Sequence, residues 1–378
     1  MRILIAAGGT GGHIFPGITI AQTIRRRNPE AEILFVGSRR GMEADIVPRF
    51  GFAFDAIPAH YLRRQLSLDV LRTGFTALRG LARAAAIVRR FRPDVAVGTG
   101  GYVSGPVVAA ALLLRVPVVI QEQNAFPGLT NRVLGRFACR VALGNAAAQA
   151  YFRASHRVTV TGNPIRSHIL TATRGHGLTA FGLEPSRPTL LVFGGSQGGR
   201  TINRAVQEAA PELTERLGLQ MLHQTGRAGF DAIVNHLGDR IRWIGPDHAA
   251  AGRWHVLPFI HDMPAAYAAA DLVISRAGAI TLAEVTARGL PSVLVPYPFS
   301  AEGHQEANAR VMAEAGAAVV VPDRELDGER LVKTVEELLR DPARLERMAR
   351  ASRGLARPDA AERIASLIEE AARRGGQA

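Results

Sequence analysis

The sequence predicts an α/β fold of two doubly wound domains, each built on a parallel sheet. Three observations lead to this prediction. The chain has 378 residues, enough for two domains of ordinary size. Short apolar runs typical of buried strands alternate with longer helix-forming segments. Each half also opens with a strand, a turn of paired glycines and a helix, first from residue 2 and again from residue 189.

The chain is strongly basic and otherwise has the composition of a globular protein. Hydrophobic residues make up 47% and charged residues 21%, which is sufficient for a substantial core. The formal net charge is +13, and Lys333 is the only lysine, so nearly all the basic charge is arginine. Arginine suits paired hydrogen bonds to phosphate, so the charge indicates an anionic partner. A bias in genomic base composition accounts for it equally well.

The single cysteine and the interrupted apolar runs further restrict the class of protein. Cys139 is the only cysteine, which allows no internal disulfide and no cysteine-based metal site, and we expect a reducing compartment. We see no signal peptide, because the first two residues lead directly into a strand. The longest apolar run, residues 103–120, is broken by Pro106, Arg115 and Pro117, so we do not expect it to span a bilayer.

The first half begins with a strand at residues 2–7, a glycine turn at 8–12 and a helix. Such a turn lets the backbone approach a diphosphate or a sugar closely. It is not the dinucleotide fingerprint, because Ile14 stands where the last glycine should be. The second strand, 32–36, is followed by Gly37, Ser38 and Arg39 rather than an acid for a ribose, which disfavours an NAD enzyme.

Polar residues follow several predicted strands of this half. Tyr102 follows the strand at 95–101, and Glu122 and Asn124 end the strand at 118–124. The segment 157–164 closes the half, with Arg166 just beyond it. Since the carboxyl ends of parallel strands meet at one edge, where doubly wound folds bind ligands, we expect a site there.

The second half centres on residues 271–308. A strand, a short turn, a helix from residue 279 and a second strand follow one another, and the free N–H groups of a helix start favour an anion. Glu284 lies near that helix start, where a carboxylate accepts from vicinal hydroxyls such as those of a ribose. Gln305 and Asn308 come after the second strand, at the same edge. This combination predicts a nucleotide-sugar pocket, although an ordinary βαβ unit with a capped helix has the same pattern.

We expect domain boundaries at 1–165, 166–345 and 346–378, with 167–188 as a polar linker and a ligand cleft between the two large domains. The last segment is expected to be helical, with breaks at Pro342 and Pro358.

One predicted helix suggests a membrane surface. No acidic residue occurs from 70 to 93, and an apolar stripe is flanked by arginines. This pattern is typical of a helix on an anionic membrane, and also of a helix packed on the sheet with a basic solvated edge. The stripe includes Leu68, Leu71, Phe75 and Leu78, and the flanking residues include Arg72, Arg79 and Arg83.

The second glycine turn matches a different motif. Residues 194–198 fit G-x-S-x-G, which in serine hydrolases places a nucleophile between a strand and a helix. Ser196 would be that nucleophile, with Asp271 and His304 as the acid and the base. Gly199 extends the turn in the manner of a phosphate cradle, which we favour.

Nine motifs occur in order along nearly the whole chain: GGTGGHIFP (8–16), GGYVSGP (100–106), QEQNAFPG (121–128), TGNPIR (161–166), GGSQGG (194–199), FIHDM (259–263), SRAGAITLAE (275–284), GLPSVLVP (289–296) and HQEANA (304–309). Together they resemble the MurG family of N-acetylglucosaminyltransferases.

The resemblance implies a GT-B fold, two Rossmann-like domains facing a cleft, with the last helix crossing back to the first domain. It implies transfer of GlcNAc from UDP-GlcNAc to the C4 hydroxyl of MurNAc in undecaprenyl-diphospho-MurNAc-pentapeptide (lipid I), giving lipid II at the cytoplasmic face of the membrane. No cofactor, metal or nucleic acid is implied. The chain also lacks a D-x-D motif, and its 6% aromatic content fits a nucleic-acid binder poorly.

Site residues carry over from the motifs by resemblance. Ile260 would read uracil through its backbone, Glu284 would hold the ribose, and Ser196 with Arg166 would meet the phosphates. The helix start would contribute Ala279, Ile280, Thr281, Leu282 and Ala283. The groups around the GlcNAc would be Asn124, Gln305, Thr10, Gly11 and Gly12. His304 stands where some members of the family have glutamine.

Inverting transfer needs a base for the acceptor hydroxyl. His13 is our first candidate, because imidazole suits the task and the residue lies on the glycine turn. A structural role in fixing that turn is equally compatible with the sequence, and Glu122 and Tyr102 are further candidates. A hydrolysing UDP-GlcNAc epimerase is the alternative enzyme, and it would need neither a lipid acceptor nor a basic amphipathic helix.

Overall fold

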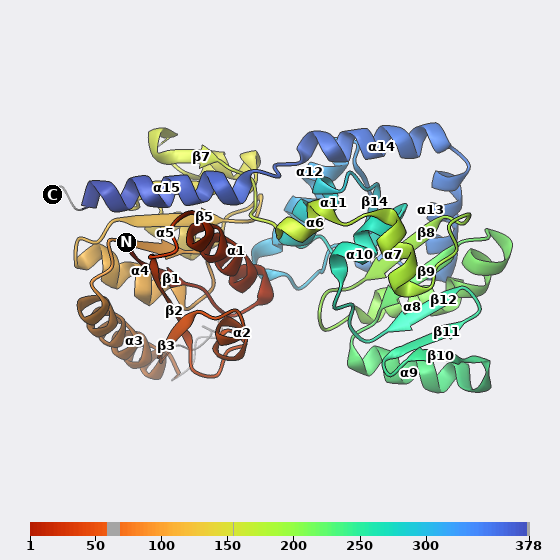
Figure 1. The fold of residues 1–378 in the computed structure, drawn as a ribbon, viewed down its shortest axis with the longest axis horizontal. Coiled ribbons are helices and arrows are strands. Elements are labelled where there is room, and N and C mark those ends of the chain that lie inside the picture. The colour runs from red at the N-terminus through yellow and green to blue at the C-terminus, as the bar shows by residue number, and fades with distance from the viewer. Residues whose placement is uncertain (59–68, 154, 376–378) are drawn as a thin grey trace. The chain divides into compact units, whose positions relative to one another are not determined.

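The computed structural model describes the backbone of residues 1–58, 69–153 and 155–375, and within these ranges all side chains except those of 69–77, 155 and 375. The chain divides into two compact units. The first comprises Met1–Ile165 and Arg357–Ala378, and the second comprises Arg166–Ala356. Both are layered α/β units built on a mainly parallel sheet, which confirms the predicted fold class (Figure 1).

The first unit has a seven-stranded parallel sheet in the order β3-β2-β1-β4-β5-β6-β7. Its strands are β1 (Arg2–Ala6), β2 (Glu32–Ser38), β3 (Ala53–Ile57), β4 (Val95–Gly98), β5 (Val118–Glu122), β6 (Arg140–Leu143) and β7 (Val158–Val160). Its helices are α1 (Gly11–Arg27), α2 (Glu43–Arg49), α3 (Asp69–Phe91), α4 (Ser104–Leu113), α5 (Leu129–Leu134) and α15 (Ala360–Gly375), with helical turns η1 (Ala146–Tyr151) and η2 (Ser155–Arg157).

The second unit has an eight-stranded sheet in the order β10-β11-β12-β9-β8-β13-β14-β15, antiparallel only where β11 pairs with β10 and β12. Its strands are β8 (Thr189–Phe193), β9 (Gln220–Gln224), β10 (Arg242–Gly245), β11 (His248–Ala251), β12 (Trp254–Leu257), β13 (Leu272–Ser275), β14 (Ser292–Leu294) and β15 (Ala318–Val320).

Helices cover this sheet and connect its strands. They are α6 (Ser167–Thr171), α7 (Arg174–Phe181), α8 (Arg200–Pro211), α9 (Arg227–Leu237), α10 (Met263–Ala269), α11 (Ala279–Ala287), α12 (His304–Glu314), α13 (Gly328–Leu339) and α14 (Pro342–Leu355), with helical turns η3 (Glu212–Arg216), η4 (Gly238–Arg240), η5 (Ala301–Gly303) and η6 (Asp323–Glu325).

The expected linker at 167–188 is wrong, because it contains α6 and α7. Both helices pack against α10. A Cβ on Gly177 would lie 2.2 Å from the Ala265 carbonyl oxygen, so glycine permits this close helix–helix contact. The glycine that suggested a loop instead serves packing.

The expected boundary at 346 also differs from the structure. Helix α14 belongs to the second unit, where it packs against α11 and α13, and only the chain from Arg357 onward belongs to the first unit. Pro342 and Pro358 do separate three helices. Pro342 opens α14 rather than breaking it, because the first helical position needs no N–H donor.

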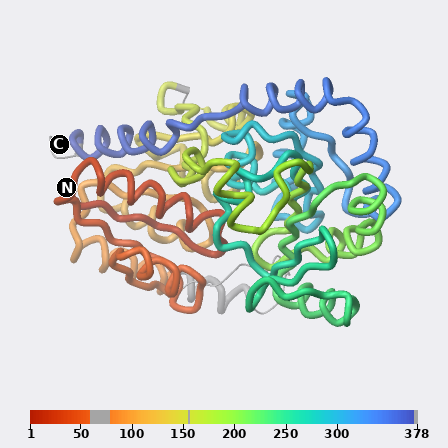
Figure 2. The backbone as a smooth tube through the Cα atoms, turned by 45° about the vertical axis from the view of Figure 1, so that its right-hand side comes forward, coloured from red at the N-terminus to blue at the C-terminus, as the bar shows by residue number. Residues whose placement is uncertain are grey.

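Helix α15 returns to the first unit and lies alongside α1, as Figure 2 shows from a second direction. Its apolar face joins the same buried cluster as the inner face of α1 and one side of the sheet, through Ile364, Ala365, Ile368, Ala371 and Ala372. The last helix is therefore part of the core of the first unit.

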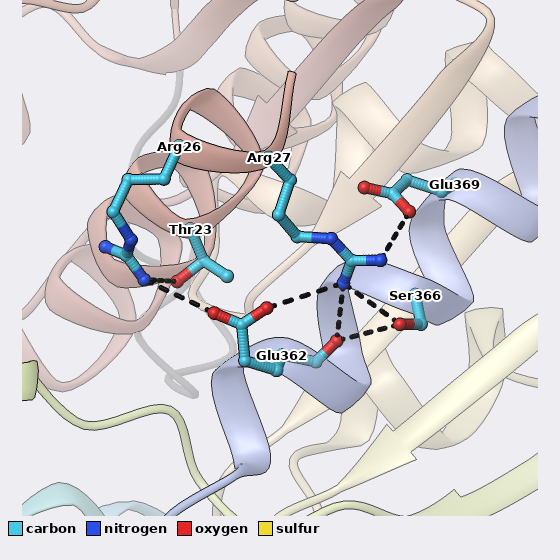
Figure 3. Close-up of polar contacts among 6 residues, drawn as sticks. All are labelled: Thr23, Arg26, Arg27, Glu362, Ser366 and Glu369. Carbon is cyan, nitrogen blue, oxygen red and sulfur yellow. Dashed lines mark hydrogen bonds and ion pairs between the residues drawn. The ribbon is translucent and has the colours of Figure 1, made fainter. Parts of the chain in front are cut away.

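Polar contacts fix the register of α15 on α1 (Figure 3). The Arg27 guanidinium donates to the Glu362 carbonyl oxygen and to Ser366 Oγ, both at 3.0 Å, and to Glu369 Oε2 at 2.8 Å. Arg26 Nη2 lies 3.4 Å from Glu362 Oε1. Arginines at the end of α1 suit the negative end of the helix dipole as well as these carboxylates.

The arginine-flanked helix α3 packs on the sheet through Ala84, Ile87 and Val88. Leu78 is 66% exposed, and Arg83 pairs with Asp55 of β3 at 3.1 Å. Of the expected membrane stripe, Leu68 lies outside the described residues, as do the side chains of Leu71, Arg72 and Phe75. Within the described part of the chain, no helix is long and apolar enough to cross a membrane.

Candidate active site

The first glycine turn brings His13 to the carboxyl edge of the first sheet. The residue lies in the first turn of α1, where Thr10 Oγ1 and His13 Nδ1 share a hydrogen bond of 3.2 Å. Thr99 Oγ1, just after β4, donates to the His13 carbonyl oxygen at 2.8 Å. The imidazole packs so closely on Gly100 that a Cβ there would lie 2.8 Å from His13 Cδ2. Two neighbouring strand ends therefore hold the histidine.

Tyr102 joins the same group. Its ring lies against Gly9, and its hydroxyl donates to Ser38 Oγ at 3.2 Å. Gly101 has φ +82°, and a Cβ on it would lie 2.1 Å from the Gly8 carbonyl oxygen. Only glycine permits this approach of the β4 and β1 loops. The structure thus brings together His13, Tyr102 and the Thr10–Gly12 turn, which we call the first-unit site.

Glu122, another candidate base, ends β5 and is buried. Its carboxylate is 1% exposed and accepts four hydrogen bonds. The donors are Asn124 N (2.9 Å), Asn124 Nδ2 (3.1 Å), Gly128 N (3.1 Å) and Asn131 Nδ2 (2.8 Å). Because both oxygens hold the loop after β5, Glu122 is poorly suited to take a proton from a substrate. It orients Asn124 instead.

The second glycine turn lies between β8 and α8 in the second unit. Gly195 and Gly198 have φ +95° and +76°. A Cβ on Gly198 would lie 1.8 Å from the Thr225 carbonyl oxygen, so the turn lies directly on the loop after β9. Ser196 is exposed at the tip, ahead of the helix that begins at Arg200. This is the geometry of a phosphate-binding turn.

The alternative catalytic triad is not assembled. Asp271 Oδ2 accepts from Thr189 N at 2.8 Å, at the amino end of β8, and also pairs with Arg174. Ser196 follows the opposite end of the same strand. A five-residue strand spans about 15 Å, so this acid cannot orient a histidine beside that serine. The proposed Ser196, His304 and Asp271 set is wrong as a triad.

Glu284 occupies a buried position on α11. Its Oε1 accepts from Arg166 Nη2 at 3.1 Å, and the Tyr267 hydroxyl hydrogen-bonds to it. Burial raises the pKa of the Glu284 carboxyl, while the Arg166 charge and the Tyr267 hydroxyl lower it. Burial and the neighbouring Glu284 hold the pKa of Tyr267 well above its usual value. Arg166, expected at the phosphates, is thus directed to the carboxylate that was expected at the ribose.

The Ile260 backbone is engaged by a residue that the sequence reading missed. Ile260 N donates to Gln224 Oε1 at 2.8 Å, and Gln224 Nε2 donates to the Gly195 carbonyl oxygen at 2.9 Å. Gln224 is the last residue of β9 and is buried. One side chain thereby links the expected base-binding position to the glycine turn. Its position at the carboxyl end of a predicted strand is the sequence feature that could have identified it.

Gln305 and Asn308 are held at the start of α11. Gln305 Oε1 accepts from Tyr297 N at 2.9 Å and from Ala277 N at 3.2 Å. Asn308 Nδ2 donates to the Ala277 carbonyl oxygen at 3.1 Å. The carboxamide oxygen of Gln305 is therefore used internally. The first turns of α11 lie beside them, with Ala279, Ile280, Thr281 and Ala283 half-buried and Leu282 buried.

We call the α11 start, Glu284, Gln305, Ile260 and the second glycine turn the second-unit site. Asn124 belongs to the first unit and Arg166 to the second. His304 begins α12 immediately before Gln305. Within the described ranges, no cluster of three or more His, Cys, Asp or Glu residues could hold a metal ion.

Two Rossmann-like units, each with a glycine turn after its first strand, are the architecture of GT-B glycosyltransferases such as the solved MurG structure. The N-terminal domain of glycosyltransferase family 28 matches residues 3–143, and its C-terminal domain matches residues 189–364. The chain belongs to this family and, within it, to the UDP-N-acetylglucosamine–N-acetylmuramyl-(pentapeptide) pyrophosphoryl-undecaprenol N-acetylglucosamine transferases.

The full length of the chain supports this membership. The transferase of that name from Desulforudis audaxviator is 47% identical over 375 residues, which cover 99% of this chain and 100% of the relative. The crystal structure of Acinetobacter baumannii MurG is 29% identical with a TM-score of 0.75, and the match covers 98% of this chain and 99% of that one. A UDP-GlcNAc 2-epimerase from Neisseria meningitidis is 15% identical with a TM-score of 0.67, over 98% and 100% of the two chains, so it shares the fold alone.

Proposed function

We propose that the chain transfers GlcNAc from UDP-GlcNAc to the C4 hydroxyl of MurNAc in undecaprenyl-diphospho-MurNAc-pentapeptide, giving lipid II for peptidoglycan synthesis. The observation that carries this proposal is the full-length identity of 47% to the Desulforudis audaxviator relative, whose name states the sugar donor and the lipid-linked acceptor. The alternative epimerase is less supported, because the epimerase likeness extends only to the fold.

The second-unit site suits the donor. Glu284 is held by Arg166 at 3.1 Å in a buried position, so its carboxylate is fixed before a ribose arrives. The glycine turn around Ser196 and the start of α11 offer backbone N–H groups to the diphosphate. Gln305 then supplies amide donors for the sugar. These groups stabilise departing UDP without requiring a metal ion.

The first-unit site suits the acceptor. In the proposed step the O4 hydroxyl of MurNAc attacks C1 of GlcNAc, the C1–O bond to the diphosphate breaks, and UDP leaves with the electron pair. A base removes the hydroxyl proton, and inversion follows from the single displacement. His13 is the base in this proposal: its Nδ1 can donate to Thr10 Oγ1, which makes Nε2 the basic nitrogen.

Acceptor-dependent UDP release tests the function. Wild-type protein is incubated with UDP-GlcNAc, with and without a soluble lipid I analogue, and both UDP and the disaccharide product are measured. Release only with acceptor, together with product, supports the transferase. Release or sugar epimerisation without acceptor indicates the epimerase, and absence of both turnover and UDP binding contradicts a nucleotide-sugar enzyme.

The role of His13 is tested by His13→Gln. General-base loss typically lowers the rate by about 100- to 10,000-fold, with the affinity for UDP-GlcNAc largely retained because the proposed contacts to uracil, ribose and diphosphate lie in the second unit. The matched control is His156→Gln, an exposed histidine of the same unit. A variant with wild-type kcat would exclude His13 as the base.

We further infer that the protein is peripheral to the cytoplasmic face of the membrane, where the lipid acceptor would be found. Helix α3 packs against α4, which packs against α5. Leu78 of α3 (66%), Leu113 of α4 (72%) and Phe137 in the turn after α5 (64%) are exposed apolar side chains. Each has an exposed arginine close in sequence: Arg79, Arg115 and Arg136. Apolar side chains beside basic ones favour an anionic lipid surface.

Vesicle co-sedimentation tests this surface. We expect binding to vesicles containing phosphatidylglycerol, weaker binding to pure phosphatidylcholine, and a clear loss with Leu113→Glu. The control is Ile244→Glu, which changes an exposed apolar side chain of the second unit. Equal loss with both variants, or equal binding to both vesicles, would contradict the proposed surface.

A further inference from the structure

A fully buried carboxyl lies behind the first glycine turn and has no part in the proposed chemistry. Glu43, the first residue of α2, is 0% exposed. Its Oε1 accepts from Ser38 N and Ser38 Oγ, both at 2.8 Å, and its Oε2 accepts from Gly9 N at 3.3 Å. Among the described residues, no ion pair joins this carboxyl to a cation. Its partners are the backbone amides of Gly9, in the glycine turn, and Ser38, at the end of β2, and the Ser38 hydroxyl.

The surrounding backbone leaves room for this side chain alone. A Cβ on Gly8, Gly37 or Gly41 would lie 2.6, 2.4 or 2.3 Å from an atom of the Glu43 side chain. None of these glycines has a positive φ. The absence of a side chain at all three positions is therefore explained by space for the carboxyl rather than by backbone conformation.

Two short paths connect Glu43 to the first-unit site. Through Gly9 it holds the residue before Thr10, whose hydroxyl contacts His13. Through Ser38 Oγ, which accepts from the Tyr102 hydroxyl at 3.2 Å, it holds the tyrosine. One carboxyl thus fixes both the glycine turn and the aromatic ring that lies against it.

We propose that Glu43 is a positioning residue that sets the glycine turn and Tyr102 for the acceptor. The inference rests on the proposed function, since it assigns Glu43 to the acceptor side of that reaction. A buried carboxyl with only neutral donors stabilises a fold less well than an apolar side chain of similar size. Its main effect should therefore fall on turnover, because small misplacements of reacting groups are costly to rate.

The first test is Glu43→Gln, measured with each substrate varied separately. Glutamine keeps the size of the side chain, but its amide group faces one of the N–H donors instead of accepting from it. We expect kcat to fall by about 10- to 100-fold and the KM for the lipid I analogue to rise. The KM for UDP-GlcNAc should rise less than the KM for the lipid I analogue, because the proposed uracil, ribose and diphosphate contacts belong to the other unit. The control is Asp45→Asn, an exposed acid on the same helix.

The second test separates positioning from folding. Ser38→Ala cuts the path to Tyr102 without altering Glu43, so it applies even where Glu43→Gln folds poorly. If Glu43 acts through Ser38, the losses in kcat of the two single variants should not multiply in the double variant. The midpoint of thermal unfolding of Ser38→Ala should change by no more than a few degrees.

The outcomes distinguish this inference from the proposed function. Inactive wild-type protein and inactive Asp45→Asn would overturn both. If the wild-type protein is active but Glu43→Gln keeps the wild-type kcat, this inference alone is overturned. An equal rise in the KM values for both substrates would also overturn it. So would losses in kcat that multiply fully in the double variant of Glu43→Gln and Ser38→Ala.

Discussion

Arg166 Nη2 donates to Glu284 Oε1 at 3.1 Å, which joins the first residue of the second unit to the middle of α11. The carboxylate has 9% of its side-chain surface exposed, whereas the guanidinium has 38%. The arginine thus offsets part of the cost of burying the acid and still faces solvent. This pair fixes the group that we propose binds the ribose.

Glu284→Ala should raise the KM for UDP-GlcNAc by about 10- to 100-fold, because a hydrogen bond to a charged group contributes roughly 1.5–3 kcal/mol. Glu284→Gln should have a smaller effect and should unfold no more easily than wild type, since it removes a carboxylate that is costly to bury. Steady-state kinetics with the concentration of UDP-GlcNAc varied measure the KM of each variant. Thermal unfolding measures the stability of Glu284→Gln. Glu329→Gln, on the exposed side of α13, is the control. An unchanged donor KM in Glu284→Ala would contradict the assignment.

Acid should destabilise the second unit through His223. Complete burial lowers the pKa of His223 to about 3, against 6.5 when unfolded. Between these values the unfolded chain binds the additional proton, so the free energy of unfolding falls as the pH drops from about 6.5 toward 3. The loss reaches about 5 kcal/mol at most. Burial disfavours the charged form of this ring, which stacks on Trp254 and hydrogen-bonds to Asn203.

Tryptophan fluorescence is a selective probe for this prediction, since both tryptophans of the chain, Trp243 and Trp254, lie in the second unit. Urea unfolding followed by fluorescence at several pH values should give a flatter pH dependence for His223→Gln than for wild type. His236→Gln, which changes an exposed histidine, should keep the wild-type slope. Identical slopes in wild type and His223→Gln would show that another group governs acid unfolding.

Gly101 and Gly105 should respond oppositely to alanine. At Gly101, φ is +82° and the added Cβ would lie 2.1 Å from the Gly8 carbonyl oxygen, so Gly101→Ala should displace the first glycine turn. We expect a loss of roughly 1–3 kcal/mol in stability and a large loss of turnover. Gly105 lies inside α4 with its nearest neighbour atom 3.7 Å from an added Cβ. Gly105→Ala should therefore stabilise by up to about 1 kcal/mol. Thermal unfolding and kcat measured on both variants decide this.

The last helix should be necessary for the stability of the first unit. Ile368 is fully buried between α15 and the sheet, so Ile368→Ala should cost about 2–5 kcal/mol. Arg374→Ala, which removes an exposed pair with Glu370, should cost less than about 1 kcal/mol. Circular dichroism, which detects both units, should show an earlier transition in Ile368→Ala. Fluorescence from the second unit should not, and an equal shift in both signals would contradict the prediction.

Local patterns predicted the elements that local chemistry determines. The two glycine turns, the strands that precede them and the helix start at Ala279 depend on neighbours in sequence, and all appear in the structure. The grouping of His13 with Tyr102 followed from the rule that parallel strands end at one edge. The antiparallel strand β10 was missed, because its residues show no alternation: Arg242, Trp243 and Ile244 are all exposed.

Roles that depend on distant partners were not predictable in this way. Glu43 meets Gly9 across 34 positions and Gln224 meets Ile260 across 36. No local period marks either contact. The sequence could not predict the contacts of Glu122 either, since an acid at a strand end has the same pattern whether it faces a substrate or accepts from Asn131 nine residues later. Sequence placed Glu122 at the site, whereas Glu43 and Gln224 are recognised only from their contacts.

Because α15 belongs to the first unit, the second unit is an insertion within the first. During synthesis the ribosome releases the second unit complete while the first still lacks a helix of its core. At about 5–20 residues per second, the 200 or so residues after the first-unit sheet take roughly 10–40 s to appear. For that interval the apolar face of α1 that α15 later covers has no partner from its own chain. The unit made first is therefore completed last, and its nascent form is the one that we expect chaperones to bind.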